Sequence, residues 1–293
     1  MVSKQYFLIL DTSNSMKLHT INTGLFKLDG GAMFGVVPKT LWQKTNPADE
    51  NNLCTLAMRC LLIEDEERLI LIDTGIGNKQ SEKFFSHYEL HGDASLNQSL
   101  NNLGFQADDL TDVFLTHLHF DHVGGAVVLK DDQLVPAFKN ATYWSNQKHW
   151  NWAINPNERE KASFLEENIL PLQESGQLKF INPGNASFTD LFSLRFAFGH
   201  TEAMMLPQIS YKNQTLVYVA DLLPTVGHIP LPYIPAYDMF PLQTLIEKKA
   251  FLEEAAEKNY ILFLEHDPEN ECCTVKRTEK GIRLKETFKL SDI

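Results

Sequence analysis

Three histidines and one aspartate lie within six positions of this sequence, in the segment THLHFDHVGG that begins at Thr116. His117 and His119 are two positions apart on an extended segment, so their side chains project to the same side and can bind one divalent cation. Asp121 and His122 follow directly and can turn toward a second cation. Imidazole together with carboxylate is a donor set typical of zinc. The motif therefore predicts two metal ions close enough to share a bridging water.

One loop supplies too few ligands for two ions, so other segments must contribute. Three strand-like apolar runs end in a metal-binding residue type, namely His200, Asp221 and His266, and functional groups gather at strand ends in α/β proteins. Taken singly, each of these residues is more often a structural histidine or a turn aspartate. Together with the motif they complete two ligand sets: His117, His119 and His200 for one ion, Asp121, His122 and His266 for the other, and Asp221 as the bridge.

Asp73 ends another apolar run, residues 69–72, and precedes Thr74 and Gly75. Its carboxylate can accept a hydrogen bond from a ligand imidazole and so fix the tautomer that binds metal. The alternative is an aspartate that caps the turn before Gly75. We assign Asp73 to the positioning of a metal ligand.

The elements that must position these residues are mainly strands. Runs rich in β-branched and aromatic residues recur along the chain, and helical patterns over residues 95–103, 146–152, 158–169 and 241–258 separate two strand-rich groups near residue 175. Two sheets packed face to face with helices outside fit this order. A doubly wound sheet is the competing fold, and no Gly-x-Gly-x-x-Gly turn supports it. In the last helix we expect an apolar stripe to face the core: Leu242, Leu245, Ile246, Leu252, Ala255 and Ala256.

The ligand pattern resembles the signature of the metallo-β-lactamase superfamily, and the resemblance extends from about Lys17 to His266. It implies an α/β fold, the αββα four-layer sandwich of that family, with a dinuclear site at one edge of the two sheets. It also implies the two ligand sets given above and a cofactor of two Zn²⁺ ions, with other divalent metals as alternatives.

Within the superfamily, the HLHFDH motif and residues 29–39 are similar to the N-acyl homoserine lactonase-like, quorum-quenching branch. The resemblance implies opening of a lactone ring by a metal-bridging hydroxide, with Asp121 as the catalytic proton carrier. Lactonases of this branch carry a tyrosine three positions after the bridging aspartate, where this chain has Pro224. We expect His228 and Tyr233 to be the catalytic replacements.

An apolar pocket for an acyl chain requires large side chains near the motif. Phe34 and Phe120 lie closest to the two segments that carry the resemblance, and we predict that they bind substrate. A plain core role is the alternative, because the chain contains 19 phenylalanines.

Other functions of the same scaffold stay open. A phosphotriesterase similar to methyl parathion hydrolase and a thioesterase would use the same ligands, and a metal-binding module without turnover is the non-enzymatic alternative. Flavodiiron oxidoreductases carry a glutamate in place of the second histidine, so His119 favours hydrolysis.

Composition limits the partners. The formal net charge is −12 and no lysine- or arginine-rich run is present, which argues against nucleic acid. No apolar stretch approaches the roughly 20 residues that a bilayer requires, so we expect a small-molecule substrate and no membrane partner.

Residues 1–15 lack a secretory pattern, and the four cysteines lack a zinc-site spacing. We therefore expect a cytoplasmic protein with an N-terminal extension over 1–15 and one hydrolase domain over 16–293, either monomeric or a homodimer.

Overall fold

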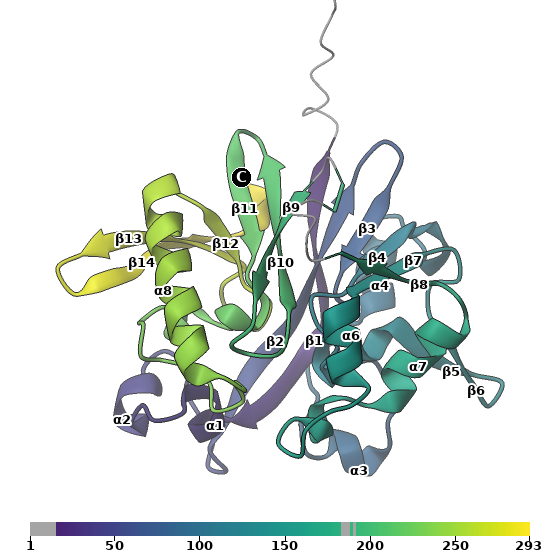
Figure 1. The fold of residues 1–293 in the computed structure, drawn as a ribbon, viewed down its shortest axis with the longest axis horizontal. Helices are drawn as coiled ribbons and strands as arrows, with labels where there is room; N and C mark the ends of the chain where they lie inside the picture. Colours follow the sequence, from purple (N-terminus) through teal and green to yellow (C-terminus); the bar gives the residue numbers. More distant parts are fainter. Residues whose placement is uncertain (1–15, 183–187, 190–191) are drawn as a thin grey trace, which may run out of the picture.

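The computed structural model describes residues 16–182, 188–189 and 192–293, and the predicted extension over 1–15 lies outside them. Two six-stranded sheets form the centre of the molecule (Figure 1). The first has the order β1 (Lys17–Asp29), β2 (Leu53–Glu64), β3 (Leu69–Ile72), β4 (Asp112–Phe114), β7 (Thr142–Asn146) and β8 (Leu178–Ile181). The second has the order β14 (Gly281–Phe288), β13 (Cys272–Thr278), β12 (Ile261–Phe263), β11 (Gln214–Tyr218), β10 (Met204–Tyr211) and β9 (Phe192–Ala197).

Strand β2 shows why the sheets form the middle layers. Its residues are buried almost without interruption, as expected for a strand covered on both faces. Leu61 and Ile63 belong to the apolar core that contains the second sheet. Cys60 and Leu62 point the other way, into a core shared with the helices, because successive side chains of a strand alternate between faces.

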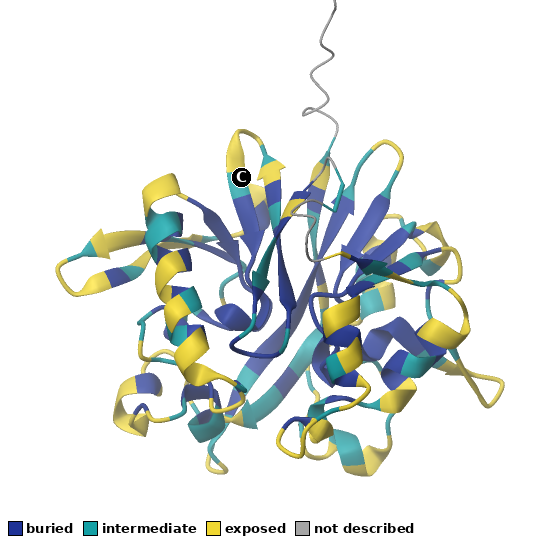
Figure 2. Cartoon of the chain, in the orientation of Figure 1, coloured by how far each residue is buried: buried dark blue, intermediate teal, exposed yellow. Residues whose placement is uncertain are grey.

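Helices cover the outer faces of both sheets, so the αββα prediction is confirmed (Figure 1). On the first sheet, α4 (Leu96–Asn102), α6 (Gln147–Ala153) and α7 (Glu166–Glu174) contribute Leu100, Trp150 and Leu172 to its outer core. On the second sheet, α8 (Pro241–Lys258) contributes Phe251. Figure 2 shows the same layering, with buried strands in the middle and exposed outer faces on the helices.

The predicted bounds of α8 are confirmed, but its predicted core-facing stripe is wrong in part. Leu242 and Ile246 are 77% and 65% exposed. The helix instead buries Thr244, Lys248 and Phe251, because the face that contacts the second sheet begins two positions later than the apolar pattern indicates.

The helix expected over residues 158–169 is also wrong at its start. The side chain of Asn157 accepts hydrogen bonds from the backbone N–H groups of Arg159 and Glu160, which turns the chain, and regular helix begins only at Glu166. An asparagine that bonds its own downstream backbone competes with helix formation in this way.

Shorter elements connect the layers. The small helices are α1 (Gly30–Phe34), α2 (Lys39–Trp42), α3 (Glu82–Phe85) and α5 (Phe120–Val123), and a separate hairpin consists of β5 (Val127–Lys130) and β6 (Gln133–Pro136). The 3₁₀ turns are η2 (Ala107–Asp109), η3 (Gly124–Ala126), η4 (Lys161–Ser163), η5 (Ala220–Leu222), η6 (Val226–His228) and η7 (Leu290–Asp292).

The structure also shows the apolar character of the helices and the state of the cysteines. Within the described ranges, no helix has the length and apolar character needed to span a membrane. All four cysteines are buried and form no disulfide: Cys54, Cys60, Cys272 and Cys273.

Candidate metal centre

The motif forms a tight loop after β4. His119 is the N-cap of α5, and its carbonyl accepts hydrogen bonds from the backbone of His122 and Val123. The loop lies against the segment after β3, where Thr74 donates its backbone N–H to the carbonyl of His122. A Cβ on Gly124 would lie 2.1 Å from the carbonyl oxygen of Ile76. Only glycine therefore permits this close approach, which holds the motif after β4 against the segment that follows the parallel neighbour β3.

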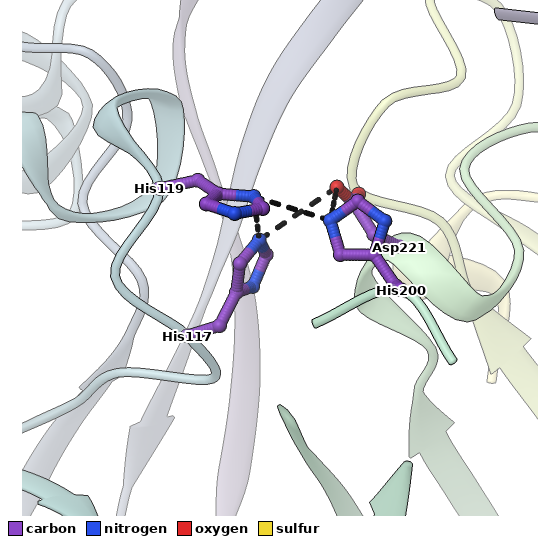
Figure 3. Close-up of side chains that lie close together, drawn as sticks. All are labelled: His117, His119, His200 and Asp221. Atoms are coloured by element: carbon purple, nitrogen blue, oxygen red, sulfur yellow. Dashed lines mark hydrogen bonds and ion pairs between the residues drawn. The ribbon is translucent and has the colours of Figure 1, made fainter. Parts of the chain in front are cut away.

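The first group contains three histidines and one aspartate whose side chains converge (Figure 3). Nδ1 of His119 lies 3.0 Å from Nε2 of His117 and 3.1 Å from Nε2 of His200. Oδ2 of Asp221 lies 2.9 Å from Nε2 of His200 and 3.7 Å from Nε2 of His117. His200 follows β9 and Asp221 lies in η5 after β11, so three separate segments build the group.

The second group contains Asp121, His122 and His266. The Nε2 atoms of the two histidines lie 3.1 Å apart, and Oδ2 of Asp121 lies 3.8 Å from each. Asp221 reaches this group too, since its Oδ1 lies 3.0 Å from His266 Nε2 and its Oδ2 lies 3.6 Å from His122 Nε2. The structure thus brings the seven predicted ligands together, with Asp221 between the two groups.

These distances fit metal ions. Four donors about 2.0–2.1 Å from a tetrahedral zinc lie roughly 3.3 Å from one another, within the range that the donor atoms span. Burial lowers the pKa of His117 well below its usual value, so its imidazole is neutral and free to ligate. Burial by itself would raise the pKa of Asp221, but His200 and His266 lower it far below its usual value. Asp221 is therefore an anion whose buried Oδ1, although 3.0 Å from Nε2 of His266, lacks a hydrogen bond of suitable geometry, as suits a ligand between two cations.

Asp73 lies behind the second group. Its carboxylate accepts hydrogen bonds from the backbone N–H and the hydroxyl of Thr116, and its Oδ2 lies 3.1 Å from Nδ1 of His122. Glu265 approaches the same nitrogen, with Oε2 at 3.1 Å. Burial raises the pKa of this glutamate to about 7. Glu265 was not among the predicted site residues, although its carboxylate directly follows an apolar run, which was a visible signal.

Two further carboxylates lie behind ligands of the first group, and sequence reasoning missed both. Glu160 is buried and its Oε1 lies 2.9 Å from Nε2 of His119. Asp238 is buried and its Oδ1 lies 2.9 Å from Nδ1 of His200. Such outer carboxylates orient ligand imidazoles and fix their tautomer. Both come from irregular segments, where no periodic pattern identifies them.

A cavity of about 220 Å³ opens over the two groups. Phe120 lines it, as predicted for a residue that binds substrate, and Phe34 does not. Two tyrosines that the sequence did not single out, Tyr88 and Tyr237, line it as well, and so does Arg159. The remaining walls are mostly apolar: Leu28, Met33, Leu56, Ala162, Pro224 and Pro235.

The two expected replacements for the lactonase tyrosine, His228 and Tyr233, do not line the cavity. Both ring nitrogens of His228 are in use, Nδ1 with the hydroxyl of Thr225 at 2.9 Å and Nε2 with the carbonyl of Met33 at 2.9 Å. Phe34 stacks on the His228 ring at 4.4 Å, and Tyr233 meets Phe34 edge-on at 6.3 Å. The three rings therefore pack against one another, because η6 and the loop after it both contact α1.

The chain is similar to known proteins in sequence and in fold. Residues 59–266 match the model of the metallo-beta-lactamase superfamily. An N-acyl homoserine lactonase from Bacillus thuringiensis is 34% identical over 129 residues, which are 41% of this chain and 46% of the relative, so the match spans less than half of that lactonase.

Solved structures match over a longer range. A probable metal-dependent hydrolase from Staphylococcus aureus is 29% identical with a TM-score of 0.83, over 94% of this chain and 99% of that one. AidC, a dizinc quorum-quenching lactonase, is 25% identical with a TM-score of 0.76, over 94% and 95% of the two chains. Since the family model covers most of the chain and the fold agrees with that of a solved metal-dependent hydrolase, this chain belongs to the metallo-β-lactamase superfamily.

Proposed function

We propose that this protein is a dinuclear zinc hydrolase that opens the ring of N-acyl homoserine lactones or of related lactones. The observation that carries the proposal is the position of the two ligand groups: they share Asp221 and form the floor of a mostly apolar cavity. The likeness to a Bacillus thuringiensis lactonase and to AidC supports the choice of a lactone over other esters.

His117, His119 and His200 would hold one ion, Asp121, His122 and His266 would hold the other, and Asp221 would bridge them. Bound zinc supplies a Lewis acid and a water that is acidic enough to react near neutral pH. The buried carboxylates behind or between these histidines are free to compensate the charge of bound cations, because their ion pairs among the described residues are with histidines and not with lysine or arginine: Asp73, Glu160, Asp221, Asp238 and Glu265.

Asp121 is the proposed proton carrier. Its Oδ2 is the oxygen that faces His122 and His266, and its side chain also lines the cavity. Oδ1 can therefore accept a proton from the attacking water and return it to the alkoxide that leaves when the ring opens. One oxygen of the Asp121 carboxylate would then bind the metal ion while the other carries the proton.

Tyr88 and Tyr237 are the proposed hydrogen-bond donors to the substrate, in place of His228 and Tyr233. Burial raises the pKa of Tyr88 to about 12 and raises the pKa of Tyr237 as well, and Asp121 adds to both shifts. Both phenols therefore keep their protons at neutral pH. Tyr88 is held by its ring contact with Phe120, with centroids 4.7 Å apart.

The remaining apolar wall suits an acyl chain. Phe120 and the aliphatic side chains around it offer no hydrogen-bonding groups, and burial of a chain against them gains about 0.8 kcal/mol per CH₂ group. We expect longer acyl chains to bind more tightly until the cavity is full.

The test is a hydrolysis screen with zinc-loaded protein. Ring opening of N-hexanoyl and N-decanoyl homoserine lactones is followed in a pH-stat, beside an aryl phosphotriester, a thioester and a β-lactam. We expect base uptake with the two lactones, its loss after chelation and its return with added zinc. Clear phosphotriester or thioester hydrolysis without any ring opening would contradict the lactone assignment. Zinc-dependent stability without turnover of any substrate would favour the metal-binding module.

A further inference from the structure

Glu160 is a buried carboxylate that joins the first ligand group to the wall of the cavity. Its Oε1 lies 2.9 Å from Nε2 of His119, while Nδ1 of the same ring points at His117 and His200. A carboxylate at Nε2 keeps the proton on that nitrogen, so the lone pair of Nδ1 is directed at the ion site. The Nε1–H group of Trp152 and the hydroxyl of Thr201 also donate to Glu160. Its position is thus determined from three sides.

The residues next to Glu160 face the substrate cavity. Arg159, Ala162 and Ser163 line it, and the turn that carries them is closed by Asn157, whose side-chain oxygen accepts from the backbone N–H groups of Arg159 and Glu160 at 2.9 and 3.1 Å. Because the turn is short, a displacement of Glu160 displaces these wall residues too.

The opposite wall has a matching connection. Pro235 and Tyr237 line the cavity, and Asp238, the next residue, contacts Nδ1 of His200 at 2.9 Å and accepts from Thr244 of α8 at 2.6 Å. The guanidinium of Arg159 donates to the carbonyl of Ala236. The two walls are therefore bonded to each other, and each is bonded to a ligand of the same group.

We propose that Glu160 is a positioning residue that couples metal binding at the first group to the placement of the wall formed by residues 159–163. A metal ion held at Nδ1 of His119 would fix the orientation of the ring, and the contact of the ring with Glu160 would in turn fix the turn that carries Glu160. By thermodynamic linkage, an ordered turn strengthens metal binding by the same factor by which metal orders the turn. The inference rests on the metal centre of the proposed function and is independent of the substrate.

The test compares Glu160→Gln with Glu158→Gln. Glu158 is exposed on the same turn, so both variants remove one negative charge, and only Glu160→Gln replaces the carboxylate that contacts His119 by a neutral amide, which is a weaker acceptor and lacks the second acceptor oxygen. Zinc affinity is measured by competition with a chromophoric chelator. Hydrogen exchange of backbone amides in residues 157–163 is measured with and without zinc, and neither readout requires a substrate.

We expect Glu160→Gln to weaken zinc binding about 10- to 100-fold and Glu158→Gln to change it less than twofold. In the wild type, zinc should slow exchange in residues 157–163. In Glu160→Gln saturated with zinc, that protection should be lost. Wild-type affinity in Glu160→Gln, or equal protection of the turn in the two variants, would overturn the proposal.

A folding defect is separated from the proposed role by a second variant. Trp152→Phe removes one donor to Glu160 and leaves His119 and its carboxylate contact in place. We expect faster exchange of residues 157–163 in this zinc-loaded variant, with unchanged far-UV circular dichroism. Unchanged exchange there would also count against the proposal. Because no lactone enters these measurements, a failure of the lactone assignment would leave their outcome unaffected.

Discussion

Nζ of Lys248 lies 2.7 Å from the carbonyl oxygen of Tyr233. Through this contact and a second one to the carbonyl of Pro230 at 3.1 Å, a buried lysine of α8 holds the loop that continues to Pro235 and Tyr237 in the cavity wall. Burial lowers the pKa of Lys248 to about 7, against a smaller opposing effect of Asp238.

The stability of the protein should therefore depend on this lysine between about pH 7 and pH 10. In that range the unfolded chain binds a proton at Lys248 that the folded protein does not bind, so the free energy of unfolding should rise with pH, by up to about 1.4 kcal/mol per pH unit. Lys248→Met should lose this part of the slope. Denaturant unfolding at several pH values, with Lys249→Met as the exposed control, measures it. Identical slopes in the wild type and Lys248→Met would refute the prediction.

Two metal ions should bind per chain, because seven ligands exceed what one tetrahedral zinc can use. Elemental analysis of zinc-loaded protein should give about two equivalents. His119→Ala and Asp221→Ala should each reduce this number, abolish hydrolysis and lower the melting temperature only when zinc is present, since metal binding stabilises the folded state. A single equivalent, with no second ion on titration, would exclude the dinuclear centre.

Asp121→Asn should lower turnover far more than metal content. The amide retains an oxygen for the ion but cannot accept the proton. We expect kcat to fall at least about 100-fold, the low end of what general base catalysis contributes, with zinc content near that of the wild type. Near-normal kcat in Asp121→Asn would show that another group moves the proton.

Tyr237→Phe should lower kcat/KM for an N-acyl lactone by about tenfold or more, because the loss of one donor to the transition state costs about 1.4–3 kcal/mol. Tyr88→Phe should act in the same direction. Tyr233→Phe and the distant control Tyr211→Phe should stay within twofold, since neither side chain lines the cavity. The measurement is kcat/KM from steady-state kinetics with N-hexanoyl homoserine lactone. An equal decrease of kcat/KM in all four variants would indicate a general destabilisation of the protein instead.

Much of the site was predictable because its chemistry is local. His117, His119, Asp121 and His122 lie in one short motif, and His200, Asp221 and His266 each follow an apolar run, so residue type and position at a strand end were enough to predict that these side chains come together. The two-sheet fold followed from the same runs, and Pro241 indicated where α8 begins. That these seven residues bind two zinc ions stays a prediction for the metal analysis above.

Only the tertiary structure decided which segments far apart in the chain contact one another. Glu160 and Asp238 reach His119 and His200 from irregular loops, where no repeating pattern reveals which way a side chain points. His228 and Tyr233 were expected at the cavity, but η6 and the loop after it place them against Phe34 and bring Tyr237 to the cavity instead. Sequence determined which donors exist and which strands carry them. The long-range packing of the loops determined which side chains support the ligands and which ones meet a substrate, because a loop takes its path from its tertiary contacts and not from a local periodicity.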